Sequence, residues 1–316
     1  MLSEVAESPR DLLVILGPTA SGKTGLGVML ARMLEGEIIS ADSRQVYRGL
    51  DIGSGKDLTE YEVDGKSIPY HLIDIVELSA EYSVFHYQQD CYAIINKLRN
   101  SQSLPILVGG TGLYLEAVLQ GYRMVEAPEN LSLRDAFSVL SIEELQNKLH
   151  EMHPKLHNST DLLDRDRLIR ALEIAYHAKW NPPPPAPDIN PVILGIQWER
   201  AILRKRIALR LKDRLDEGLI EEVSQLHSKG FTWSRLELLG LEYRYVSLYL
   251  QGVINNRNDL YQKLFTAICQ FAKRQETWFR RMERRGHTIY WLNGADLDTA
   301  LERVREHTWV TPLIPT

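Results

Sequence analysis

Residues 17–24 read Gly17-Pro18-Thr19-Ala20-Ser21-Gly22-Lys23-Thr24, which matches the phosphate-binding pattern G-x-x-x-x-G-K-[ST]. The short apolar run Asp11-Leu-Leu-Val-Ile-Leu16 predicts a strand before this loop. Apolar residues from Leu26 to Leu34 recur at helical spacing and predict a helix after it. Such a turn directs backbone N–H groups and the positive end of the helix dipole at an anion. A coincidental turn is the alternative, but the flanking elements favour a phosphate or diphosphate site.

Two side chains of this loop carry specific chemistry. The Lys23 ammonium adds a point charge for the phosphate oxygens. The Thr24 hydroxyl is placed to ligate Mg²⁺, which is the metal we expect at this site.

Composition fits a soluble globular enzyme. The 316 residues are 44% hydrophobic and 25% charged, and no apolar stretch is long enough to cross a membrane. The first ten residues lack the apolar region of a signal peptide, so we expect a cytoplasmic protein. The two cysteines, Cys91 and Cys269, each lie on a predicted helix and form neither a disulfide framework nor a zinc pattern.

Charge is distributed unevenly along the chain. Residues 200–285 contain 18 Lys and Arg against 10 Asp and Glu, a balance of +8, although the whole chain carries −5. A basic C-terminal third in an acidic protein suggests a local site for a polyanion. Solvated helical faces with paired charges are the alternative.

Predicted strands alternate with predicted helices in the first 121 residues. We expect strands at 37–41, 67–74 and 105–108, and helices at 84–98 and 113–119. This alternation predicts an α/β fold: a parallel sheet of the P-loop NTPase kind with helices on both faces.

The character changes after Gly121, where no convincing strand occurs until residue 191. Ser141 and Glu144 form a capping box that starts a helix, which we expect to end at His153-Pro154. A second helix is predicted from about 163 to 178, followed by a proline-rich linker, a strand at 191–196, mostly helix over 199–285 and a strand at 288–292. We therefore predict a P-loop core at 1–121, a helical insertion at 122–190, and the rest of the core with a basic helical region at 191–316.

Further candidate residues follow two of the predicted strands. Asp42 follows the strand at 37–41, and Gly109-Gly-Thr-Gly112 follows the strand at 105–108. Strand carboxyl ends form the ligand-binding edge of a parallel sheet, so Asp42 and Thr111 should lie near the phosphate loop. There Asp42 can act as a base or assist Mg²⁺, and a helix N-cap is its structural alternative. For His71 and Asp74 we expect structural roles.

These stretches resemble the tRNA dimethylallyltransferases, also called tRNA isopentenyltransferases, of the bacterial type. The resemblance rests on the phosphate loop, on Ser40-Ala-Asp-Ser-Arg-Gln-Val-Tyr47 and on Pro105-Ile-Leu-Val-Gly-Gly-Thr-Gly-Leu-Tyr114. It continues through Asp166-Arg-Leu-Ile-Arg-Ala-Leu-Glu173, Gly218-Leu-Ile-Glu-Glu-Val223 and Ala272-Lys-Arg-Gln-Glu-Thr-Trp-Phe-Arg280. No stretch after Trp291 resembles the zinc finger that eukaryotic members often add.

Two stretches depart from the family pattern. Many members have Gly-Thr-Ala-Lys-Pro where this chain has Gly53-Ser-Gly-Lys-Asp57. They have Ile-Gly-Tyr-Lys/Arg-Glu/Gln where this chain has Leu239-Gly-Leu-Glu-Tyr-Arg244. We expect both stretches to face substrate and to affect specificity more than the reaction.

The resemblance implies transfer of a dimethylallyl group from dimethylallyl diphosphate to N6 of adenosine 37 in tRNA. Asp42 would be the base, and Thr111 would lie near the reacting amine. Lys23, the loop amides and Mg²⁺ on Thr24 would neutralise the departing diphosphate, and Arg210 matches an arginine near it. The diphosphate-binding residues would be Gly17, Pro18, Thr19, Ala20, Ser21, Gly22, Lys23 and Thr24.

The tRNA anticodon stem-loop is the partner implied, bound by a monomer. Trp278 could stack on a base, although packing in the core is the more common fate of a tryptophan. Basic residues beside it, up to Arg285, recur along one predicted helix and would contact phosphates. The tRNA-binding candidates are Asp42, Ser43, Arg44, Gln45, Thr111, Arg134, Arg167, Arg170, Lys273, Arg274, Gln275, Trp278 and Arg280.

Three other functions stay open at this point. An adenylate isopentenyltransferase would share the chemistry but use a free adenine nucleotide, which needs neither a basic helix nor an insertion. A small-molecule P-loop kinase would leave Asp42-Ser-Arg-Gln45 unexplained. A non-catalytic RNA-binding protein would not need Lys23, Thr24 and Asp42 intact.

Overall fold

The computed structural model describes residues 12–152 and 163–307, and its contacts divide the chain into two compact units. One unit runs to Gln120 and resumes at Asp188, and the other is Gly121–Pro187. The predicted helix end at His153-Pro154 and the predicted start of the first strand at Asp11 lie outside the described residues.

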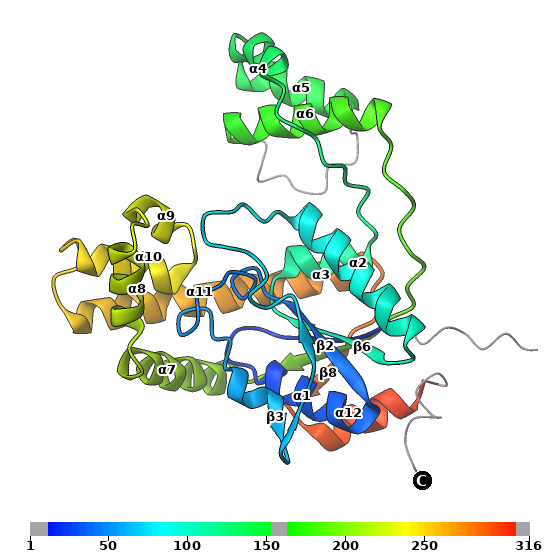
Figure 1. The fold of residues 1–316 in the computed structure, drawn as a ribbon, viewed down its shortest axis with the longest axis vertical. Helices are drawn as coiled ribbons and strands as arrows, with labels where there is room; N and C mark the ends of the chain where they lie inside the picture. Colours follow the sequence, from blue (N-terminus) through cyan, green and yellow to red (C-terminus); the bar gives the residue numbers. More distant parts are fainter. Residues whose placement is uncertain (1–11, 153–162, 308–316) are drawn as a thin grey trace, which may run out of the picture. The chain divides into compact units, whose positions relative to one another are not determined.

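The larger unit is built on a six-stranded sheet in which every neighbouring pair is parallel (Figure 1). The strand order is β5-β2-β6-β1-β7-β8, which confirms the predicted α/β class. β1 lies inside the sheet, with Leu13 opposite Ile106 on one side and Val192 on the other. The strands are β1 (Leu13–Leu16), β2 (Gly36–Ala41), β5 (Tyr70–His71), β6 (Leu104–Gly109), β7 (Val192–Gln197) and β8 (Tyr290–Asn293).

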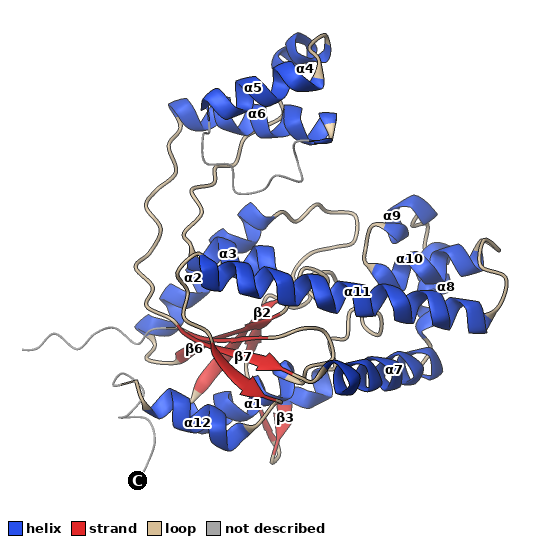
Figure 2. Ribbon diagram, turned by 180° about the vertical axis from the view of Figure 1, so that it is seen from behind, coloured by secondary structure: helices blue, strands red, loops and turns tan. Residues whose placement is uncertain are grey.

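Helices cover both faces of this sheet, because alternate residues of a buried strand point to opposite sides. Leu13 and Ile15 of β1 pack in a core with helices α1 and α12, whereas Val14 and Leu16 pack with α2, α3 and the end of α11. Figure 2 shows the two layers on either side of the strands. The covering helices are α1 (Lys23–Leu34), α2 (Val84–Asn100), α3 (Gly112–Leu119), α11 (Arg257–Arg284) and α12 (Leu297–Arg305).

A separate helical core extends the larger unit. It buries Leu211, Leu219, Tyr243 and Leu264, among others, and packs together the region predicted to be mostly helical. Its helices, besides the first half of α11, are α7 (Arg200–Asp216), α8 (Leu219–Ser228), α9 (Trp233–Glu237) and α10 (Leu241–Leu250).

The strand predicted at 67–74 is much shorter than expected. Only Tyr70 and His71 pair with β2, and a separate antiparallel pair, β3 (Glu62–Val63) with β4 (Lys66–Ser67), precedes them. Leu72 and Asp74 adopt positive φ values of 62° and 55°, which ends the extended conformation that a strand requires.

The regular elements among the described residues of the smaller unit are all helices. This was predicted because its sequence contains no convincing strand pattern. The capping box is confirmed, because the Ser141 N–H donates to Glu144 Oε2 at 2.7 Å and the Glu144 N–H donates to Ser141 Oγ at 3.2 Å. Leu145 and Leu149 pack against Leu168 and Leu172 in a small core of their own. Its helices are α4 (Leu131–Ser138), α5 (Ile142–Met152) and α6 (Arg165–Trp180).

None of the helices within residues 12–152 and 163–307 is long and apolar enough to span a membrane.

Candidate functional site

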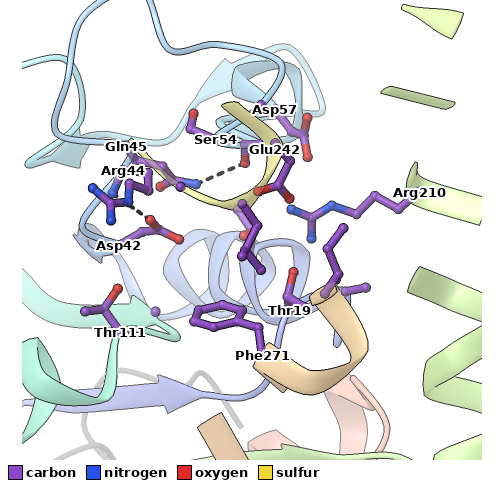
Figure 3. A pocket seen from close by; sticks show the side chains of 18 of the residues that line it. Thr19, Asp42, Arg44, Gln45, Ser54, Asp57, Thr111, Arg210, Glu242 and Phe271 are labelled. Atoms are coloured by element: carbon purple, nitrogen blue, oxygen red, sulfur yellow. Dashed lines mark hydrogen bonds between the residues drawn. The ribbon is translucent and has the colours of Figure 1, made fainter. Parts of the chain in front are cut away.

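A cavity of about 600 Å³ opens at the carboxyl ends of β1, β2 and β6 in the larger unit. It brings together five groups of predicted residues from distant parts of the sequence (Figure 3). Asp42 and Thr111 lie on one side, and Arg210 reaches in from the other. The predicted site residues in its wall are Thr19, Ala20, Gly22, Lys23, Thr24, Asp42, Ser43, Arg44, Gln45, Thr111, Arg210, Arg274 and Gln275.

The phosphate loop has the strand–turn–helix form that its sequence predicted. Gly22 caps α1 with a φ of 90°, a left-handed conformation that glycine adopts without strain. Two side chains hold the turn from outside: Trp198 donates its indole N–H to the Ser21 carbonyl at 2.9 Å, and Arg206 Nε donates to the Ala20 carbonyl at 2.7 Å. The first N–H groups of a helix have no partner within it, so those of α1 are left to face an anion.

Two cations beside this loop are held in an unfavourable electrostatic state. Burial, followed by repulsion from Arg210, lowers the pKa of Lys23 to about 8, and Asp42 opposes that shift only in part. Burial, followed by repulsion from Arg214, lowers the pKa of Arg210 to about 10. Among the described residues no carboxylate lies within ion-pair distance of Arg210. An anion between these cations would relieve both penalties.

Asp42 and Thr111 are joined through the backbone where β2 and β6 end. The Asp42 Oδ1 atom accepts the Arg44 N–H at 2.9 Å, and Thr111 Oγ1 accepts the Ser43 N–H at 3.1 Å. One carboxylate oxygen therefore holds the turn, and Figure 3 shows the carboxylate facing the cavity. Asp42 does not cap a helix, because residues 43–46 form a turn.

Gln45 and Gln275 line the cavity but use their amides to brace it. Gln45 accepts a hydrogen bond from Ser40 Oγ at 2.8 Å and donates to the Gly55 carbonyl at 3.0 Å. Gln275 accepts from the Thr19 N–H at 2.9 Å and donates to the Gly110 carbonyl at 2.8 Å. Gln275 thereby ties the phosphate loop to the glycine turn after β6. A contact of either side chain with tRNA stays a prediction.

The loop at residues 51–57 is held by two side chains that the sequence analysis did not predict to be part of the site. The Glu222 carboxylate accepts the N–H groups of Asp51, Ile52 and Gly53 at 3.1, 2.7 and 3.1 Å, and the Tyr243 hydroxyl donates to it at 2.7 Å. Burial and the neighbouring Glu222 carboxylate raise the pKa of Tyr243 well above its usual value, so the phenol stays a donor.

A buried lysine fastens the same loop. Lys56 is 2% exposed and donates to the Tyr47 carbonyl at 2.8 Å, to Asp51 Oδ1 at 2.9 Å and to Asp74. Asp74 thus has the structural role expected for it, as does His71, whose ring lies 2.7 Å from a Glu37 carboxylate oxygen.

Arg210 is one of three arginines spaced four residues apart on α7. Arg206 and Arg214 also line the cavity, one helical turn before and after it. The repeated spacing at 206, 210 and 214 was the signal that could have identified them in the sequence.

The basic stretch at the end of α11, from Lys273 to Arg285, contains two sets of side chains. Arg281 and Arg285 both form ion pairs with Glu116, whose side chain is fully buried, so these two match the paired-charge alternative. Lys273, Arg274 and Arg280 are exposed, and no carboxylate in the described part of the chain pairs with them. Lys273 and Arg280 line a second groove rather than the cavity.

Trp278 lies partly buried against the core. The Arg281 guanidinium covers its ring at 3.9 Å from the ring centre, and Gly112 lies against the same ring. This is the packing alternative considered above, and base stacking by Trp278 stays a prediction.

In the smaller unit, two of the three predicted tRNA-binding arginines hold a buried carboxylate. Arg134 donates to both oxygens of Glu173 at 2.9 and 3.1 Å, and Arg170 donates to Glu173 at 3.2 Å. Hydrogen bonds from Arg134 and from the Asn130 N–H outweigh burial and lower the pKa of Glu173. The third, Arg167, donates its N–H to the Asp164 cap at 3.1 Å.

The residues around the phosphate loop fit Mg²⁺ held chiefly by a substrate. Within the described ranges no cluster of three His, Cys, Asp or Glu could cage a metal. Thr24 does line the cavity, and Mg²⁺ is commonly held by one or two protein oxygens together with phosphate oxygens.

Comparisons with known proteins identify the family. The family model described as IPP transferase matches residues 45–282. The chain is 56% identical over 299 residues to tRNA dimethylallyltransferase 1 of Syntrophus aciditrophicus, covering 94% of this chain and 98% of the relative. It is 57% identical to tRNA dimethylallyltransferase 1 of Geotalea uraniireducens, covering 90% and 93%.

Solved structures with the same fold include two informative neighbours. The tRNA isopentenylpyrophosphate transferase of Bacillus halodurans has a TM-score of 0.68 at 32% identity, covering 96% of this chain and 98% of that one. A eukaryotic dimethylallyltransferase described as acting on tRNA has a TM-score of 0.73 at 24% identity, covering 93% and 77%, and supports the fold alone. The extent of these matches shows that this chain is an enzyme of the IPP transferase family, whose curated relatives are bacterial tRNA dimethylallyltransferases.

Proposed function

We propose that this enzyme transfers the dimethylallyl group of dimethylallyl diphosphate to N6 of adenosine 37 in tRNA. One observation carries the proposal: a phosphate loop with two unneutralised cations and a strand-end carboxylate face the same cavity. The cations suit the diphosphate of the donor, and the carboxylate suits the amine of the acceptor.

The reaction requires help at both ends of the forming bond. The exocyclic amine of adenine is a weak nucleophile, because its lone pair is delocalised into the ring. As N6 bonds to the allylic carbon, Asp42 would take the N6 proton and Thr111 would help to position the amine.

The departing group must be neutralised at the same time. The bond between the allylic carbon and the diphosphate oxygen breaks, and its electron pair leaves with the diphosphate. Lys23, Arg210 and the N–H groups at the start of α1 would stabilise that charge. Mg²⁺, held by Thr24 and the diphosphate, would supply further neutralising charge.

Side chains of the cavity wall would keep water from the allylic carbon, which water could otherwise capture. Phe271, Ile268, Leu241 and Val108 are among the apolar groups available for this. We propose further that the enzyme works as a cytoplasmic monomer and that Lys273, Arg274 and Arg280 contact tRNA phosphates.

An acceptor competition tests this function. The protein is incubated with labelled dimethylallyl diphosphate and with unmodified tRNA, AMP or ATP. Labelled tRNA supports the proposal, whereas labelled AMP or ATP supports an adenylate isopentenyltransferase. Labelling of no acceptor would favour a kinase or a non-catalytic RNA-binding protein.

A further inference from the structure

Arg214 is a buried arginine of the cavity wall whose charge is only partly compensated. Its side chain is 7% exposed. The Nη1 atom lies 3.3 Å from Glu242 Oε1 and 3.5 Å from the Gly53 carbonyl oxygen. The Nη2 atom is buried and has no hydrogen-bond partner among the described residues. A buried guanidinium nitrogen without a partner is costly, which suggests that a ligand completes it.

A glycine makes room for this arginine. A Cβ atom on Gly55 would overlap Arg214 Nη2 and would lie 2.5 Å from Arg210 Nη2. Both nitrogens therefore occupy the space of one missing methyl group, and Gly55 itself has a φ of 65°. Any larger residue at position 55 would displace at least one of the two guanidinium groups.

The guanidinium groups of Arg210 and Arg214 therefore lie close to each other and near the Lys23 ammonium. Two guanidinium groups this close repel each other unless an anion lies between them. Glu242 pairs with Arg214, but Arg210 Nε is also buried without a hydrogen-bond partner in the described part of the chain. The cluster therefore presents unused donors from two adjacent guanidinium groups to one region of the cavity.

The two stretches that depart from the family pattern meet at this point. Gly53 and Gly55 come from the first, and Glu242 and Tyr243 come from the second. A Cβ on Gly53 would lie within 2.8 Å of the Tyr243 ring and hydroxyl, just as one on Gly55 would overlap Arg214. The two departures are thus adjacent parts of one arrangement built around Arg214.

We propose that Arg214, admitted by Gly55 and oriented by Glu242, is a second arginine that binds the diphosphate of the donor together with Arg210 and Lys23. The inference rests on the proposed function and adds to it a residue that recognises the leaving group. A diphosphate can accept from several donors at once, which two adjacent guanidinium groups and one ammonium provide.

Binding of inorganic diphosphate in the presence of Mg²⁺, measured by calorimetry on the full chain, tests the proposal. Arg214→Met keeps a long unbranched side chain and removes the charge. We expect its diphosphate affinity to fall roughly 10- to 100-fold while tRNA affinity is unchanged, because a hydrogen bond to a charged group is lost. An affinity within twofold of the native protein would overturn the proposal, as would a loss confined to tRNA.

A matched pair of variants separates charge from packing. Arg214→Lys keeps a positive charge on a long side chain and leaves Gly55 and Arg210 unchanged. If Arg214 only fills space, Arg214→Lys should bind diphosphate no better than Arg214→Met, which would overturn the proposal. We expect it to recover part of the affinity that Arg214→Met loses. Arg303→Met removes an exposed arginine paired with Glu306 at 2.9 Å outside the cavity, and should bind diphosphate normally.

A third variant changes affinity in the opposite direction and keeps the guanidinium. Glu242→Gln keeps an amide oxygen that can accept from Arg214 Nη1 and so preserves its orientation, but it removes the competing negative charge, so diphosphate affinity should rise several-fold. A fall would mean that the ion pair is structural and that the proposal is wrong.

The prenyl-transfer assay on the native protein distinguishes a failure of the Arg214 inference from a failure of the proposed function. If the native protein prenylates tRNA but Arg214→Met binds diphosphate normally, only this inference fails. If the native protein neither binds diphosphate nor prenylates tRNA, the proposed function fails and the inference fails with it.

Discussion

Arginines on α7 and arginines on α11 look alike in the sequence but face different surroundings. Arg210 of α7 lines the cavity without a carboxylate partner in the described residues, and its pKa is lowered by burial and by Arg214. Arg281 of α11 has a buried partner in Glu116. A count of positive charge therefore locates a basic region but does not tell ligand-binding groups from structural ones. Only the position of the carboxylates makes that distinction.

The largest effect is expected at the carboxylate opposite the α7 arginines. Asp42→Asn keeps the shape of the side chain but removes the base, so turnover should fall about 10²–10⁴-fold in a single-turnover transfer assay. Donor binding should persist. As a control, Asp296→Asn alters an acidic helix cap that accepts the Thr299 N–H at 2.7 Å outside the cavity, and turnover should stay native. Native turnover in Asp42→Asn would reduce Asp42 to a turn-forming residue.

Removal of the lysine in the phosphate loop should lower turnover somewhat less than Asp42→Asn does. Lys23→Ala removes one preorganised positive group from the leaving diphosphate, so turnover should fall about 10²–10³-fold. Affinity for tRNA, measured by filter binding, should change little. Lys66→Ala, on the exposed hairpin of the same unit, provides the control. If both variants turn over normally, the phosphate loop does not hold the leaving group.

Two neighbouring arginines of α11 provide the sharpest test of the comparison. Arg281→Ala leaves Glu116 with one partner fewer, so the free energy of unfolding in denaturant should fall by about 1–3 kcal/mol. Arg280→Ala should leave stability unchanged, because the side chain is exposed. Instead it should reduce the slope of log tRNA affinity against log salt by about 0.7–0.9. The reverse pattern is a loss of stability in Arg280→Ala and a reduced salt slope in Arg281→Ala. It would mean that Arg280 is the structural residue and that Arg281 contacts tRNA phosphates.

The smallest effect concerns pH. Because the pKa of Lys23 is lowered to about 8, the ammonium is charged below that pH and loses its proton above it. The KM for dimethylallyl diphosphate should therefore rise as pH increases through about 8, by up to about tenfold per unit. Lys23→Arg keeps its charge and should abolish this inflection. An inflection that persists in Lys23→Arg would assign it to another group.

Local motifs made much of the fold and part of the site predictable. The phosphate loop, β2 and β6 were predicted because each is a continuous run with its own turn chemistry, and Asp42 and Thr111 follow directly from the strand ends. The strand at 67–74 was predicted too long, because nothing in its apolar pattern signalled the left-handed conformation of Leu72 and Asp74.

Groups that act across long sequence separations were not predictable. Glu222 holds the N–H of Asp51 across 171 positions, and Arg281 meets Glu116 across 165. Periodicity shows that a side chain lies on a helical face, but it does not show which distant group packs there. For the same reason, the sequence did not indicate that the Arg214 guanidinium occupies the space where a side chain at Gly55 would lie.

The central claim is that an exocyclic adenosine amine in tRNA accepts the prenyl group in this cavity. It is tested most directly by single-turnover transfer from labelled dimethylallyl diphosphate to two anticodon stem-loops that differ only at position 37, followed by digestion to nucleosides. One stem-loop carries adenosine, and the other carries inosine, which lacks the amine. The account predicts N6-dimethylallyladenosine from the first stem-loop and no labelled nucleoside from the second. Equal labelling of both stem-loops, or no label in the adenosine stem-loop, would contradict it.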